Sequence, residues 1–182
     1  MSDINKQRRQ FLKLATAISV AVASLSPMQV IAGKITEDNK MDATEHAVFT
    51  KMLTISLPTE GSPLIPPASL PVIPTIEGAL LAGMPPHIRQ SLNQGIHYFN
   101  QGPLKKYGKS FNELPDEQAT AFVDEWTSSN KAPHRALAMG LKKLTVLAYW
   151  AIPDTWTPLG YVGPVSEKWK LKYRGVTPEP KA

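Results

Sequence analysis

The chain has 182 residues, and once residues 1–32 are set aside the remainder suffices for one domain with a single hydrophobic core. The formal net charge is +5, but residues 1–32 supply three of those charges, so the remaining +2 removes the main support for a nucleic-acid partner. The sequence has no cysteine, which excludes disulfides, thiolate metal sites, cysteine-ligated iron–sulfur clusters, covalently attached c-type haem and a lipid anchor on cysteine.

Residues 1–32 have the pattern of a twin-arginine (Tat) export signal, which directs folded proteins across the inner membrane. The motif consists of Arg8, Arg9, Phe11, Leu12 and Lys13. Gln7 departs from it, because Ser or Thr usually stands there. The apolar stretch 14–25 is shorter than the roughly 20 residues that span a bilayer, so it fits a signal core better than an anchor. We therefore expect a signal peptide and a periplasmic protein.

Two alternatives for this segment stay open. The sequence Val30-Ile31-Ala32 fits a signal-peptidase site, and Ala21-Val22-Ala23 is a second candidate. An ordinary secretory signal, or an amphipathic start to a cytoplasmic domain, is the other interpretation. Exchange of both motif arginines for lysine separates these cases, because export that continued unimpaired would exclude a twin-arginine signal.

The first helix is predicted over about 43–56. Asp42 and Glu45 have the spacing of a capping box, in which each side chain accepts a hydrogen bond from the other's backbone amide. Pro58 ends this helix. Residues 58–74 then hold six prolines among apolar side chains, a density that prevents helix and sheet pairing alike. We expect this segment to wrap over the core or over another subunit.

Two helices are predicted next. Thr75 is expected to cap a short one that runs to about Leu81. Pro85 and Pro86 suit the first turn of a longer one, which ends at Gly102. The apolar stripe of the longer helix consists of Ile88, Leu92, Ile96 and Phe99.

The last two predicted helices begin at Leu114-Pro115-Asp116-Glu117 and at about residue 133, the second running to about 151. Their inward residues are predicted to be Ala119, Phe122, Val123 and Trp126, and Leu137, Leu141, Leu144, Leu147, Ala148 and Ala151. The pattern then becomes irregular, aromatic and glycine-rich. Because no alternating strand pattern of useful length appears, we expect an all-α fold. Residues 33–182 would form a single small domain of four to five helices with long proline-rich loops and a basic C-terminal tail.

No active site is recognisable in the sequence. Its four histidines are His46, His87, His97 and His134, and no two are closer than ten residues, whereas a metal pair on one helical face needs a spacing of three or four. No phosphate loop follows a strand and no nucleophile elbow is present. We expect no catalytic residue, cofactor or metal in this chain. The alternatives are an independent periplasmic enzyme or metal-binding protein built on the histidines, and a periplasmic binding module for a small ligand.

The second half of the chain carries short motifs that are distinctive in combination. They lie at residues 111–118, 126, 133–135, 141–144, 148–150, 153–156 and 159–164. Together they resemble the gluconate 2-dehydrogenase subunit 3 family, over roughly residues 42–165 and most specifically over 126–164.

The resemblance implies a non-catalytic small subunit that pairs with a large FAD-dependent sugar or alcohol dehydrogenase of the glucose–methanol–choline type. The small subunit would carry the large one through the Tat translocase. A multihaem cytochrome c often completes such complexes, so FAD and haem would belong to partners. The protein would be periplasmic, held at the inner membrane through those partners, with no membrane span of its own once the signal is removed. The residues do not identify the substrate.

Aromatic residues near the irregular C-terminal part are predicted to contact the partner. They are Tyr149, Trp150, Trp156, Tyr161 and Trp169. Aromatic side chains bury large areas with little loss of rotamer freedom and commonly anchor interfaces. For Trp156 and Tyr161 the alternative is that they fold back on the last helix as ordinary core. The 58–74 segment is also expected at an interface.

Overall fold

The computed structural model describes residues 40–170, and within that range every regular element is a helix. The body of the domain consists of α2 (Ala43–Ser56), α4 (Pro86–Gln101), α6 (Asp116–Thr127) and α7 (Ala132–Trp150). Shorter segments connect them: η2 (Pro67–Ser69), α3 (Val72–Thr75), η3 (Ile76–Leu81), α5 (Leu104–Tyr107) and η4 (Phe111–Glu113). The all-α prediction is therefore confirmed. The predicted export motif, Arg8, Arg9, Phe11, Leu12 and Lys13, lies outside the described residues.

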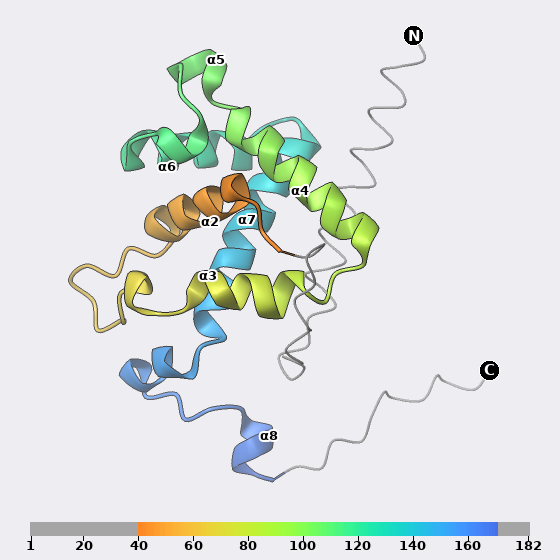
Figure 1. Ribbon diagram of the computed structural model, residues 1–182. Helices are drawn as coiled ribbons and strands as arrows, with labels where there is room; N and C mark the ends of the chain where they lie inside the picture. The colour runs from red at the N-terminus through yellow and green to blue at the C-terminus, as the bar shows by residue number, and fades with distance from the viewer. Residues whose placement is uncertain (1–39, 171–182) are drawn as a thin grey trace.

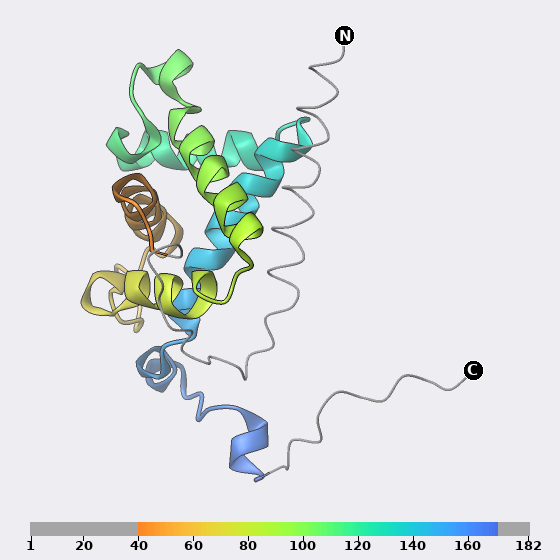
Figure 2. The same ribbon diagram turned by 45° about the vertical axis from the view of Figure 1, so that its right-hand side comes forward.

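Helix α7 is the central element of the domain (Figure 1 and Figure 2). It contacts α2, α4, α6 and the continuous stretch formed by α3 and η3. Its predicted inward stripe is buried at Leu137, Leu141, Leu144 and Ala148. Of the other two residues predicted to face inward, Leu147 is half-buried and Ala151 is exposed, because α7 stops one residue before Ala151 and the chain turns away from the core.

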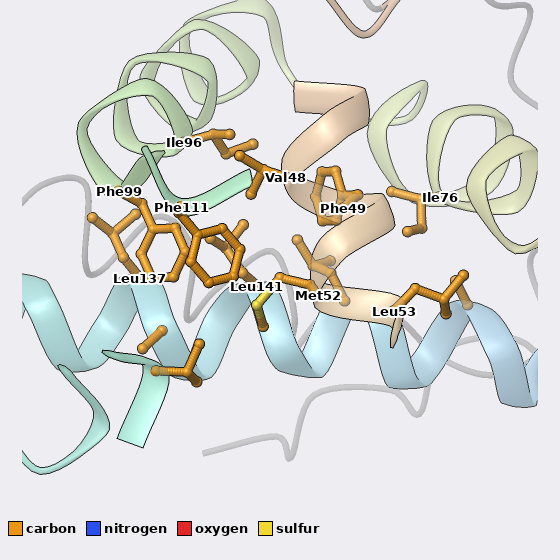
Figure 3. Close-up of a cluster of buried hydrophobic side chains, with 14 of the residues drawn as sticks. Val48, Phe49, Met52, Leu53, Ile76, Ile96, Phe99, Phe111, Leu137 and Leu141 are labelled. Carbon is orange, nitrogen blue, oxygen red and sulfur yellow. The ribbon is translucent and has the colours of Figure 1, made fainter. Parts of the chain in front are cut away.

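Helix α2 begins and ends where the sequence predicts. The capping box forms, with the Glu45 amide donating to the Asp42 carboxylate at 2.9 Å and the Asp42 amide donating to the Glu45 carboxylate at 3.0 Å. One face of α2 then enters the core beside α7 (Figure 3). That face consists of Val48, Phe49, Met52 and Leu53.

The proline-rich segment 58–74 lies on the core of this chain, the first of the two placements that the sequence predicted. Pro67 and Val72 are buried within it. From α7, the Tyr149 hydroxyl donates a hydrogen bond to the backbone carbonyl of Ile65 at 2.8 Å. Tyr149 is itself fully buried. The Tyr149 ring thus belongs to the core and its hydroxyl holds the segment, so this residue, predicted at the partner interface, presents no surface to a partner in this structure.

The short helix that Thr75 was expected to cap starts four residues earlier than predicted, at Val72 after the N-cap position Pro71. Thr75 has helical backbone angles, and its hydroxyl donates to the carbonyl of Pro71 at 2.8 Å rather than capping a helix start. Pro74 is tolerated because the amides of a first helical turn have no acceptor within the helix, so proline loses nothing there. The chain then continues through η3 as a π-helix.

A cluster of aromatic rings fills the space between α4, η4 and α6. Phe99 meets Phe111, Phe122 and Trp126 edge-on, with ring centroids 4.7, 5.2 and 5.2 Å apart, an arrangement that aromatic quadrupoles favour. The chain leaves α4 at Gly102, directly against these rings. A Cβ atom there would lie 2.6 Å from a ring carbon of Trp126 and 2.7 Å from one of Phe122, so the cluster leaves room only for glycine.

Candidate partner interface

The chain leaves the helical body after α7 and forms a C-terminal arm, residues 152–170 (Figure 1 and Figure 2). The arm contains η5 (Pro153–Thr155), η6 (Thr157–Leu159) and α8 (Val165–Lys168). Its short helices follow from its composition, because Pro153 and Pro158 suit first turns and Gly160 ends η6 in the left-handed conformation, with φ of 68°.

The arm is fastened to the end of α7 by side-chain hydrogen bonds. The buried Thr155 hydroxyl donates to the carbonyl of Tyr149 in α7 at 3.4 Å and, within the arm, to that of Ile152 at 2.7 Å. The indole nitrogen of Trp156 donates to the carbonyl of Trp150 at 2.8 Å. Tyr161 folds back over Trp156, with ring centroids 5.3 Å apart and a 75° angle between the rings, and its amide donates to the Trp156 carbonyl at 3.1 Å. The arm thus has a defined shape.

The arm exposes a series of apolar side chains. Its exposed large apolar residues, with their exposed fractions, are Leu159 (54%), Tyr161 (48%), Val162 (74%), Val165 (51%) and Trp169 (66%). Within residues 40–170 three other large apolar side chains are exposed, and only one of them, Met139 at 58%, is as exposed as these. Single exposed apolar side chains are ordinary, but a contiguous series in one segment is typical of a protein–protein contact.

The predicted interface residues divide into three groups. Tyr161 and Trp169 are exposed and lie in the arm. Trp150 and Trp156 are half-buried at its attachment to α7, and Tyr149 is buried. Aromatic composition alone missed the aliphatic residues Leu159, Val162 and Val165. The signal that could have found them is their position after α7, where no helical or strand spacing pairs an apolar face with the core.

The sequence model of the family described as Gluconate 2-dehydrogenase subunit 3 matches residues 32–163, well over half of the chain. The chain belongs to this family. Subunit 3 is the small subunit of such dehydrogenase complexes. The match covers the whole helical body and the arm as far as Gly163. Searches of curated proteins and of solved structures found no match.

The histidines of this subunit 3 protein do not converge. His46 and His87 are exposed, His97 pairs with Asp42, and His134 stacks on Trp126 with ring centroids 3.9 Å apart. Among residues 40–170, no three potential ligands of the histidine, cysteine, aspartate and glutamate types are grouped so as to hold a metal ion. The histidine-based alternative therefore has no ligand set in the described part of the chain.

A buried ion pair joins α2 to α4. Glu45 is fully buried and Arg89 is 4% exposed. The two terminal nitrogens of the guanidinium donate to the two carboxylate oxygens, each at 2.6 Å, and one also donates to the carbonyl of Lys40 at 3.0 Å. The sequence predicted Glu45 only as a capping residue. Arg89 was missed, although its spacing of three and seven from Leu92 and Ile96 places it on the same buried face of α4.

Asp42, beside this ion pair, accepts hydrogen bonds from two further residues of α4. The side-chain nitrogens of Asn93 and His97 both lie 2.7 Å from one carboxylate oxygen. Partial burial disfavours the ionised form of Asp42, but the hydrogen bonds from His97, the Glu45 amide and Asn93 outweigh it and lower the pKa to about 2. These contacts fix the start of α2 against α4, where the described chain begins.

No helix within residues 40–170 combines the length and the apolar character needed to cross a membrane. The longest, α7, has 19 residues but carries Arg135, Lys142 and Lys143. It is an internal helix of the domain, with its apolar stripe turned to the core.

Proposed function

We propose that this subunit 3 protein is a non-catalytic escort and stabiliser of an FAD-dependent sugar or alcohol dehydrogenase of the glucose–methanol–choline type, and that its Tat signal exports both chains to the periplasm. The observation that carries the proposal is the C-terminal arm of a chain whose family is the small subunit of dehydrogenase complexes. A series of exposed apolar side chains favours a permanent partner, since obligate interfaces are more hydrophobic than transient ones.

The twin-arginine motif supports the escort role. A flavoenzyme binds FAD as it folds, and FAD is available in the cytoplasm, so its export requires a pathway that accepts folded cargo. A partner without a signal can use the same pathway if it is already bound to a chain that has one. The proposal therefore requires the interface to form before export.

The role of the arm in binding the partner is tested by introducing negative charges among its exposed apolar residues. Val162→Glu with Val165→Glu changes two exposed side chains, so the helical body keeps its stability. We expect this variant to copurify at least about ten-fold less flavin per chain than the unchanged protein, because a buried unpaired charge at an interface core is strongly unfavourable. The matched control is Met139→Glu, which alters a 58% exposed residue of α7 outside the arm. Equal flavin yields from all three proteins would refute the role of the arm.

The escort role is tested by locating the dehydrogenase activity. Arg8→Lys with Arg9→Lys keeps the charge of the signal but removes its motif. We expect both this chain and the dehydrogenase activity to remain in the cytoplasm, whereas the control Lys6→Arg leaves both in the periplasm. Periplasmic activity that persists without the arginine pair would show that the dehydrogenase does not depend on this signal.

A further inference from the structure

A cleft of about 1040 Å³ lies between the end of α4, α5, the end of α6 and the start of α7. Helix α5, which forms one edge of the cleft, and the C-terminal arm lie at opposite ends of the molecule (Figure 1 and Figure 2). The cleft is therefore separate from the proposed interface on the arm.

The charge of the cleft comes from lysines on its rim. Lys105, Lys106 and Lys131 line it together with one acidic residue, Glu125. Lys106 is bound to Glu125 across the cleft at 2.6 Å. Lys105 and Lys131 are exposed, and within residues 40–170 neither has a carboxylate within ion-pair distance. The rim thus has a net charge of +2 when His134 is neutral.

Three rings that line the cleft, those of Tyr98, Trp126 and His134, contact one another. The imidazole of His134 lies nearly parallel to the indole of Trp126, at a 7° angle, and its Nε2 atom is 2.9 Å from the Tyr98 hydroxyl. Partial burial and the neighbouring positive charge of Lys131 lower the pKa of His134. His134 is therefore neutral at pH 7, and the positive potential arises from the lysines above it.

We infer that this cleft receives an acidic surface segment of the dehydrogenase subunit, an inference that rests on the proposed function. The Lys106–Glu125 pair shows the contact that the cleft accommodates, an ammonium and a carboxylate facing each other across the opening. Carboxylates of a partner would occupy the same position opposite Lys105 and Lys131. Polar side chains from the connection between α6 and α7, Ser128, Ser129 and Asn130, supply additional hydrogen-bonding groups.

The exposed lysines of the cleft favour a protein segment that carries several carboxylates over a small anion. Exposed lysine ammonium groups are strongly hydrated and hold a small anion weakly, whereas several carboxylates on one rigid surface engage them together. A membrane surface is disfavoured because the charges surround a concave opening rather than a flat or protruding face.

The test is a double charge reversal, Lys105→Glu with Lys131→Glu, measured by the association of the subunit with its copurifying flavoprotein after the two are separated. We expect the association rate to fall about ten-fold at about 50 mM salt, and the difference to vanish at about 0.5 M salt, because electrostatic steering is screened. The matched control is Lys142→Glu with Lys143→Glu, an identical charge change at exposed residues of α7 that do not line the cleft. We expect the control to associate within about two-fold of the unchanged protein.

Three outcomes would overturn the inference. If the cleft and control variants associate equally while charges on the arm prevent association, the inference fails and the proposed function stands. If the unchanged subunit binds no flavoprotein, both fail. If Lys105→Glu with Lys131→Glu abolishes binding to phosphatidylglycerol vesicles but leaves association with the flavoprotein unchanged, the cleft binds membranes. Unchanged circular dichroism of each variant shows that the fold is retained.

Discussion

Removing one partner of the buried Glu45–Arg89 pair should destabilise the domain more than removing both. Glu45→Gln preserves the volume of the side chain but leaves the guanidinium, only 4% exposed, without its counter-charge. Breaking a buried ion pair in this way costs about 3–5 kcal/mol. Against a typical domain stability of about 5–15 kcal/mol, that is about a fifth of the total or more.

The double variant Glu45→Leu with Arg89→Met replaces both charges by apolar groups of similar volume. Such replacements are often nearly neutral, although this one also removes the hydrogen bond that the Asp42 amide donates to Glu45, which contributes about 1 kcal/mol. We therefore expect the double variant to lose about 1–2 kcal/mol, less than either of its two single variants, Glu45→Leu and Arg89→Met. The two single changes would then be strongly non-additive.

Urea unfolding followed by tryptophan fluorescence measures these differences, since Trp126 is buried in the core and becomes exposed on unfolding. The free energy of unfolding is compared among the unchanged protein, both single variants and the double variant. A loss below about 1 kcal/mol for Glu45→Gln, or a double variant less stable than both single variants, would refute the reasoning.

Three further predictions concern stability. Gly102→Ala should lower the free energy of unfolding, measured in urea, by about 1–3 kcal/mol, because the new Cβ atom meets the aromatic cluster. The control Gly83→Ala, which has open space around it, should leave that free energy unchanged or slightly higher. Equal effects of the two substitutions would contradict the prediction. Tyr149→Phe removes the hydrogen bond to Ile65 and should cost about 1 kcal/mol and speed proteolytic cleavage within 58–74; unchanged cleavage would count against it. The pKa of Asp42 is lowered to about 2, so its ionised form stabilises the fold at pH values above its unfolded pKa near 4. Because the side chain is 42% exposed and screened by solvent, this contribution is only about 1 kcal/mol. It should be lost as the pH falls from about 4 to 2. Thermal unfolding of Asp42→Asn should lack that part of the pH dependence.

Local sequence signals predicted the elements whose boundaries are set locally. The capping box and Pro58 fixed both ends of α2 because the groups involved are within a few residues of one another. The buried stripe of α6 likewise followed from spacing alone, and Ala119, Phe122, Val123 and Trp126 are all buried. The start of α3 was missed because a local signal was misinterpreted. Pro74 suggested an irregular chain, yet in a first helical turn it costs nothing.

Contacts between distant parts of the chain could not be predicted from spacing. Arg89 meets Glu45 across 44 positions, and Tyr149 meets Ile65 across 84, so neither partner is visible in a local window. The cleft was missed similarly. Lys105 and Lys131 come from separate connections, and only the packing of α4 against α6 and α7 brings them to one opening.

The bend of the C-terminal arm exists before any partner arrives. Trp156 is tied to the end of α7, Tyr161 is folded over it, and Gly160 supplies the turn that L-residues resist. If the arm docks on a partner as proposed, its preorganisation avoids most of the loss of conformational entropy that a flexible peptide undergoes when it is ordered on binding. The same residues excised as a free peptide would lack the carbonyl of Trp150 that anchors them, so the proposed docking predicts that this peptide binds the partner far more weakly than the intact chain does.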